Sequence, residues 1–109
     1  MTKNSHRNID IIFNALADSS RRQILTMLTE KEMRVNDIAG HFKFSRPAVS
    51  KHLRILQESK LVVPRRDGRE RYYRVNAKPL KEVNKWLQYF DRFWDDKLIS
   101  LKNYIEKEK

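Results

Sequence analysis

The chain contains no cysteine among its 109 residues. Without cysteine there is no disulfide framework, no thiolate metal site and no cysteine nucleophile. Glycine and proline are also scarce, with two and three copies, which argues against a disordered or loop-rich chain. The two glycines, Gly40 and Gly68, are isolated, so a phosphate-cradling glycine loop is excluded.

Long hydrophobic runs are missing as well. No stretch approaches the ~20 apolar residues that a membrane-spanning helix needs, so no membrane partner is expected. The segment MTKNSHRNID has no apolar run ahead of a small-residue cleavage site, so no signal peptide is expected. The length fits a single domain over residues 1–109 with one small core. These features together predict a soluble, cytoplasmic protein.

Acidic residues are in the minority. The chain has 14 Asp and Glu against 24 Lys and Arg, which gives a net charge of +10. Residues 43–74 hold ten of the basic residues and only three acidic ones. A merely solvated basic face is the alternative, but such a bias is what a surface needs to neutralise phosphates and release counterions. The charge therefore favours a polyanionic partner, most often nucleic acid.

Apolar spacing predicts three helices ahead of this basic segment. The first covers about residues 7–17 and has apolar residues at i, i+3, i+4 and i+7 starting from Ile9. Asp18 is a suitable N-cap for the second helix. The third helix is short, over about residues 35–42.

A fourth helix is predicted from Ser45, its N-cap, to about residue 59, with Pro47 in the first turn, where a missing N–H costs nothing. The third and fourth helices form a predicted helix-turn-helix over about residues 35–59. Recognition helices usually touch bases with their N-terminal residues. The side of the fourth helix predicted to face DNA carries Arg46, Pro47, Ser50, Lys51 and Arg54.

After Leu61 the apolar period changes to two, which predicts strands over residues 61–66 and 71–76. Together they form a wing over about residues 61–76, with Asp67-Gly68 as a strong turn signal. Pro64 favours an edge position, and either Tyr72 or Tyr73 should enter the core. Arginines at a hairpin tip suit the minor groove or the flanking phosphates. The predicted DNA-binding residues of the wing are Arg65, Arg66, Arg69 and Arg71.

One long helix is predicted from about residue 79 to the end, and its apolar steps of three and four are typical of a helix-packing seam. Leu87 and Phe90 are expected in the core. This helix carries more aromatic residues than the core of one chain can cover, and a two-fold interface with a second copy explains them better. Residues 79–107 are therefore predicted to form a dimerisation helix. A pocket for an apolar effector between the subunits stays an open alternative. The predicted interface residues are Ile9, Phe13, Trp86, Phe90, Trp94, Leu98 and Leu101.

The order of these elements, mainly α with a small β-hairpin, predicts a winged helix-turn-helix of five helices and two strands. The stretches FSRPAVSKHLRIL (residues 44–56), ALADSSRRQIL (residues 15–25) and RRDGR (residues 65–69) resemble the ArsR/SmtB repressors. The resemblance spans about residues 8–90. It implies a homodimeric bacterial transcriptional repressor whose DNA-facing residues are Arg46, Pro47, Ser50 and Lys51.

The chain departs from the metal-sensing members of that family. They carry Cys-Val-Cys where this chain has Arg34-Val35-Asn36, and neither Arg34 nor Asn36 is a soft ligand. From Pro79 onward there is no histidine, and clustered surface acids such as Asp91, Asp95 and Asp96 are usually a solvated face. The resemblance is therefore to the metal-independent, SdpR-like branch, and no metal or other cofactor is expected.

No catalytic constellation is present, so an enzyme is not expected. Ser50 and His52 are two residues apart on a helix and do not face each other, and His52 is better explained as a partly buried structural residue. The predicted function is repression of transcription by a homodimer bound to double-stranded DNA at a palindromic operator. The alternative is a winged helix protein–protein module that does not bind DNA, which the basic fourth helix disfavours. An effector, and activation at some promoters, stay open.

Overall fold

The computed structural model describes residues 2–107, and their side chains from residue 9 to residue 106. Residues 1, 108 and 109 of the predicted single domain lie outside the described part. The elements in chain order are α1 (Thr2–Leu16), α2 (Ser19–Leu28), β1 (Met33–Arg34), α3 (Val35–His41), α4 (Arg46–Glu58), β2 (Val62–Asp67), β3 (Glu70–Val75), α5 (Leu80–Gln88) and α6 (Asp91–Lys107). The predicted winged helix-turn-helix is confirmed, with one added strand and one added helix.

The added strand, β1, completes a three-stranded antiparallel sheet of order β1-β3-β2. Tyr73 pairs with Met33 on one side and with Pro64 on the other, and its side chain is buried, whereas Tyr72 is half-buried. The predictions of one core tyrosine and of an edge position for Pro64 are thus confirmed. A strand of two residues has no period to detect, which is why the sequence did not predict β1.

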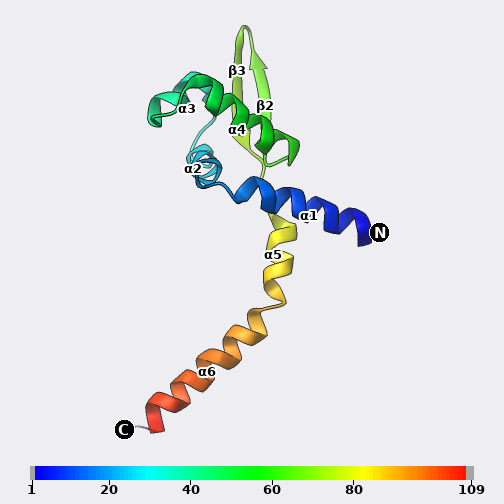
Figure 1. Ribbon diagram of the computed structural model, residues 1–109, viewed down its shortest axis with the longest axis vertical. Coiled ribbons are helices and arrows are strands. Elements are labelled where there is room, and N and C mark those ends of the chain that lie inside the picture. The colour runs from blue at the N-terminus through cyan, green and yellow to red at the C-terminus, as the bar shows by residue number, and fades with distance from the viewer. Residues whose placement is uncertain (1, 108–109) are drawn as a thin grey trace.

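The core lies between α1–α4 and the inner face of this sheet (Figure 1). The buried side predicted for α4 is confirmed, because Val49, Leu53 and Leu56 are completely inaccessible. Apolar residues of the other elements meet them there. The remaining core residues are Ile12, Ala15, Ile24, Leu25, Leu28, Met33, Ile38, Leu61, Val62 and Tyr73.

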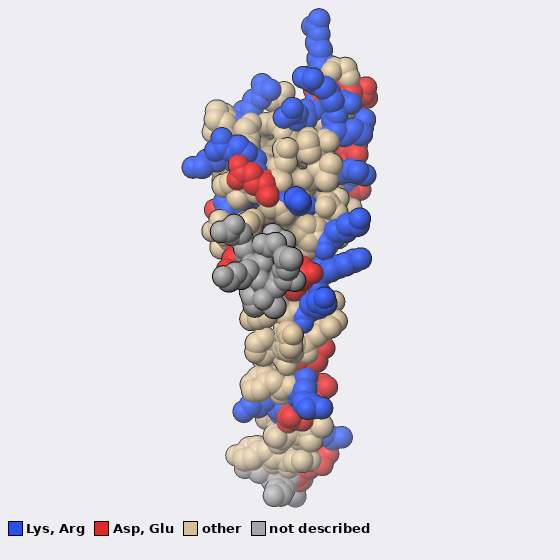
Figure 2. Space-filling view, turned by 90° about the vertical axis from the view of Figure 1, so that its right-hand side faces the viewer, with Lys and Arg blue, Asp and Glu red and all other residues tan. Residues whose placement is uncertain are grey.

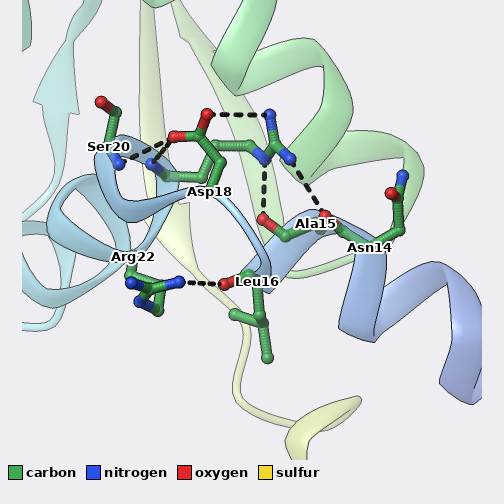
Figure 3. A network of polar contacts seen from close by, with 7 residues as sticks. Asn14, Ala15, Leu16, Asp18, Ser20 and Arg22 are labelled. Carbon is green, nitrogen blue, oxygen red and sulfur yellow. Dashed lines mark hydrogen bonds and ion pairs between the residues drawn. The ribbon is translucent and has the colours of Figure 1, made fainter.

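The corner between α1 and α2 is closed by a polar network (Figure 3). Asp18 is the N-cap of α2, as predicted, and its carboxylate accepts from the backbone N–H groups of Ser20 at 2.8 Å and Arg21 at 3.2 Å. The Arg21 backbone N–H is the main reason that the pKa of Asp18 lies below its usual value. The Arg21 guanidinium donates to the carbonyls of Ala15 at 2.7 Å and Asn14 at 3.0 Å. These bonds satisfy carbonyls that the end of α1 leaves without helical partners.

A left-handed residue ends α4 and directs the chain into the wing. Lys60 has φ of 64°, and the Leu61 N–H donates to the Leu56 carbonyl at 2.9 Å, as in a Schellman motif. The Asn76 N–H, which follows β3, donates to the Leu61 carbonyl at 2.8 Å. Both ends of the hairpin are therefore held at one point beside α4.

The prediction of one long C-terminal helix is wrong, because the helix is interrupted between α5 and α6. The N–H groups of Tyr89 and Phe90 donate to carbonyls three residues back, those of Trp86 and Leu87, at 3.2 and 3.0 Å. Such a 3₁₀ turn changes the helix direction without proline or glycine. The apolar period continues through the turn, so the turn cannot be predicted from the spacing of apolar residues.

Beyond this turn α6 runs away from the body of the protein (Figure 1). The molecule measures 65 × 39 × 20 Å and has a Cα radius of gyration of 18.9 Å, against about 13 Å for a compact chain of this length. The prediction that Leu87 and Phe90 lie in the core is wrong, because their exposed fractions are 49% and 39%. The elongated shape leaves them without enough neighbouring chain to cover them.

Candidate nucleic-acid interface

The exposed side of α4 carries the residues that were predicted to face DNA. Its N-cap Ser45 accepts from the Ala48 N–H at 3.3 Å, and proline occupies the first turn. The opposite side of the helix is buried in the core, which leaves this side open to solvent. The exposed residues include all five that were predicted there, namely Arg46, Pro47, Ser50, Lys51 and Arg54.

Aromatic packing holds the turn between α3 and α4. Phe42 and Phe44 stack with ring centroids 5.3 Å apart, and Phe44 meets the His52 ring edge-on at 6.2 Å. His52 is half-buried, and its Nδ1 is buried with no hydrogen-bond partner among the residues that the structure describes. His52 therefore packs from α4 against the turn that precedes this helix, which agrees with the structural role expected for it.

The wing is a regular hairpin that projects beyond α4 (Figure 1). Gly68 has φ of 64° and occupies the first of the two residues between the strands, where a type II′ turn places glycine. Figure 2 shows Lys and Arg gathered at the wing end of the molecule. The arginines predicted to bind DNA are all exposed there: Arg65, Arg66, Arg69 and Arg71.

The strand register divides these arginines between two faces of the hairpin. Arg66 and Arg71 are directly opposite each other and lie an even number of residues from the core residues Val62 and Tyr73, so they lie on the same face, which α4 packs against. Arg65 is opposite Tyr72 and lies on the other face, which we call the rear face of the wing. Within residues 9–106, Arg66, Arg69 and Arg71 make no ion pair with a carboxylate.

Arg65, by contrast, is bound to carboxylates on the rear face. Its Nε and Nη2 donate to Glu32 Oε2 at 3.0 and 2.7 Å, and Nη1 lies 3.9 Å from Asp67. The guanidinium also lies 4.9 Å from the centre of the Tyr72 ring. The hydrogen bonds from Arg65 lower the pKa of Glu32. Sequence reasoning missed Glu32, because only the strand register brings it to a residue 33 positions away.

A second arginine of the rear face, Arg34, joins α3 to the wing. Asp37 accepts from the Arg34 backbone N–H at 3.2 Å and from its guanidinium at 3.1 Å, which lowers the pKa of Asp37. Arg34 Nη1 also lies 3.6 Å from Glu70 at the start of β3. Among the residues described here, no three His, Cys, Asp or Glu side chains lie close enough to hold a metal ion.

The predicted dimer residues form two apolar stretches. In the first, Trp86 links α1 to α5, with its ring centroid 5.4 Å from that of Phe13 and 5.0 Å from that of Phe90. Ile9 is half-buried beside this cluster. The second stretch lies along α6, where the exposed fractions of Trp94, Leu98 and Leu101 are 60%, 61% and 55%. No helix in the described part of the chain has the length and apolar character needed to cross a membrane.

Residues 18–63 match the family model described as "Bacterial regulatory protein, arsR family". The transcriptional repressor SdpR of Bacillus subtilis (strain 168) is 36% identical over 87 residues, which cover 80% of this chain and 97% of the repressor. The HTH-type transcriptional regulator Rv2034 of Mycobacterium tuberculosis is 35% identical over 104 residues, with 95% and 94% covered. The solved structure of an ArsR-like transcriptional regulator from Rhodococcus sp. RHA1 aligns with a TM-score of 0.73 and 31% identity, covering 93% of this chain and 95% of that one.

Proposed function

Because this chain belongs to the ArsR family and is a DNA-binding transcriptional regulator, we propose that it represses transcription as a homodimer on a palindromic operator. The observation that carries the proposal is the exposed side of α4, where basic and hydroxyl side chains surround a helix N-terminus. A helix N-terminus favours a phosphate oxygen. The proposal places the protein with the bacterial chromosome in the cytoplasm.

The residues of α4 have separate roles in the proposal. Arg46 and Lys51 donate to guanine in the major groove, and Ser50 bonds to a base edge or a phosphate. Pro47 packs against the groove in the first turn, and Arg54 contacts the backbone one turn further along the helix. This division assigns base preference to the N-terminal half of α4.

The α4-side face of the wing is proposed to bind phosphates or the minor groove. Arg66 and Arg71 are directly opposite each other, and like charges in that relation repel across a strand pair. A phosphate placed between them would relieve the repulsion. Arg69 extends the same charge to the hairpin tip. Arg65 is assigned a different role below.

A second copy of the chain is the proposed partner of the uncovered apolar surface. Residues 91–96 contain three aspartates and one arginine, whereas residues 97–107 contain three lysines and one glutamate. Two antiparallel α6 helices would therefore place acidic ends against basic ends. The interface is proposed to include Ile9, Phe13, Trp86, Phe90, Trp94, Leu98 and Leu101.

The proposal needs no metal or other cofactor. Arg34 is engaged by Asp37 and Glu70, and Asn36 is a weak ligand for a transition metal. The chain is therefore proposed to belong to the metal-independent branch of the family. No small-molecule effector is assigned.

The proposal is tested by selecting bound duplexes from a pool of random DNA sequences at a stated salt concentration. We expect an imperfect palindrome whose half-sites lie about one helical turn apart. If the dimer neutralises about eight phosphates, log K should fall with log salt at a slope near −7. Failure to enrich any sequence, together with affinity that barely changes with salt, would instead support a protein–protein module.

A further inference from the structure

The rear face of the wing contains a bridge between the two edges of the sheet. Glu32 precedes β1 at one edge and Arg65 lies on β2 at the other, with β3 between them. The Arg65 guanidinium reaches across the Tyr72 ring to bind the Glu32 carboxylate at 2.7 Å. A contact that spans β3 fixes β2 relative to the segment that leads into α3.

A second bridge on the rear face also connects the hairpin to α3. Asp37, in the first turn of α3, binds Arg34, and Arg34 lies 3.6 Å from Glu70 on β3. Both bridges therefore connect the hairpin to the segment that begins the helix-turn-helix. The base of the hairpin is anchored in the core by Val62 and Tyr73, but its outer part is not, since residues 65–71 are exposed and β1 reaches only Tyr72 and Tyr73.

We infer that Glu32 is a positioning residue for DNA binding: it holds Arg65 on the rear face and so sets the wing against the helix-turn-helix. This inference rests on the proposed function, in which α4 and the wing contact one duplex together. A wing held at a fixed angle presents Arg66 and Arg71 to the backbone without having to be ordered at the moment of binding. Arg65 then serves the wing's position and makes no contact with DNA.

The geometry at Arg65 supports this division of roles. Two of its nitrogen atoms donate to Glu32 and the third lies near Asp67, so all three face carboxylates. Glu32 takes two of the five N–H donors of Arg65, and the negative charges of Glu32 and Asp67 beside the guanidinium oppose the approach of a phosphate. Arg66, the next residue along β2, points to the opposite face and makes no ion pair among the described residues.

The test compares Glu32→Ala and Arg65→Ala with the matched control Arg66→Ala in the full-length protein. We expect the first two variants to lose hydrogen-exchange protection in the wing while the thermal midpoint stays unchanged. Operator affinity should fall about threefold to tenfold, on the scale of coupling between contacting residues. The slope of log K against log salt should stay unaltered. Arg66→Ala should keep the wing protected and make the slope shallower by about 0.9 for each subunit.

The double variant Glu32→Arg with Arg65→Glu reverses the bridge and keeps the net charge of +10. If Arg65 acts through Glu32, this variant should bind the operator with an affinity within about twofold of the wild type. This remaining deficit is smaller than the loss expected when the contact is broken. The inference is overturned if Arg65→Ala makes the salt slope shallower and the reversal fails to restore affinity, because Arg65 would then touch DNA. Unchanged wing protection in Glu32→Ala would also overturn it. If the wild-type protein binds no operator, the proposed function is refuted. Hydrogen exchange would still show whether the bridge orders the wing.

Discussion

The body of the protein, from α1 to β3, and its C-terminal segment, α5 and α6, are stabilised in different ways. In the body, Ile24, Ile38 and Leu53 are completely inaccessible, whereas every described side chain of α6 is exposed. The body therefore folds on its own core. Most helical stability in proteins comes from packing of an apolar face, and α6 has no such packing in the single chain, which supports the proposed second copy as its partner.

The two regions also differ in charge. Residues 43–74 of the body are strongly basic, whereas the charges of α6 cancel and are sorted along the helix by sign. A basic body suits phosphate, and a charge-sorted apolar helix suits an identical helix in the opposite direction. The comparison supports the proposal that the body recognises DNA and that the C-terminal segment mediates assembly.

The largest expected effect comes from Trp94→Glu in α6. Burial of such a side chain contributes about 1.5–3 kcal/mol per copy, so a charge in both copies should weaken the dimer about a hundredfold or more. Sedimentation should then show monomers, and tight operator binding should be lost because one half-site is weak. Asn103→Glu is the matched control, since it adds the same charge on the opposite side of α6. A Trp94→Glu variant that still sediments as a dimer would place the interface elsewhere.

The second test compares truncations in the two regions. Leu53→Ala removes a completely buried side chain of the body and should lower the free energy of unfolding by about 2–5 kcal/mol. Leu101→Ala removes a side chain that is 55% exposed in the single chain, so its cost should depend on protein concentration. Denaturant unfolding at two concentrations measures both. Equal costs at every concentration would remove the distinction between the regions.

A third test asks which part of the body, α4 or the wing, determines base preference. Arg46→Ala should weaken the cognate operator by about 1–3 kcal/mol and relax one base position. Arg69→Ala, at the wing tip, should weaken cognate and scrambled duplexes alike. Binding of both variants to both duplexes, at fixed salt, gives the answer. Equal losses on the two duplexes for Arg46→Ala would make it a phosphate contact only.

Most of the body could be predicted from the sequence because local signals agree with its packing. Asp18 and Ser45 cap their helices as expected, and the period of α4 identified its buried side. The features that the sequence did not predict have no signal in the local spacing of apolar residues. The bridge from Glu32 to Arg65 needs the strand register, and the turn at Tyr89 interrupts a helix whose apolar period continues.

The smallest expected effect is an acid-dependent loosening of the wing, confined to the body. Hydrogen bonds from Arg65 place the pKa of Glu32 in the folded protein below its unfolded value. The bridge therefore stabilises the wing above the unfolded pKa and loses this contribution as the pH falls through the folded pKa. Hydrogen exchange of the wing should show loosening on acidification in the wild type and a flatter profile in Glu32→Gln. Glu30→Gln is the control, because Glu30 is exposed and makes no ion pair in the described part of the chain. The acid response should persist in Trp94→Glu, since both partners of the bridge lie in the body; its loss there would couple the two regions.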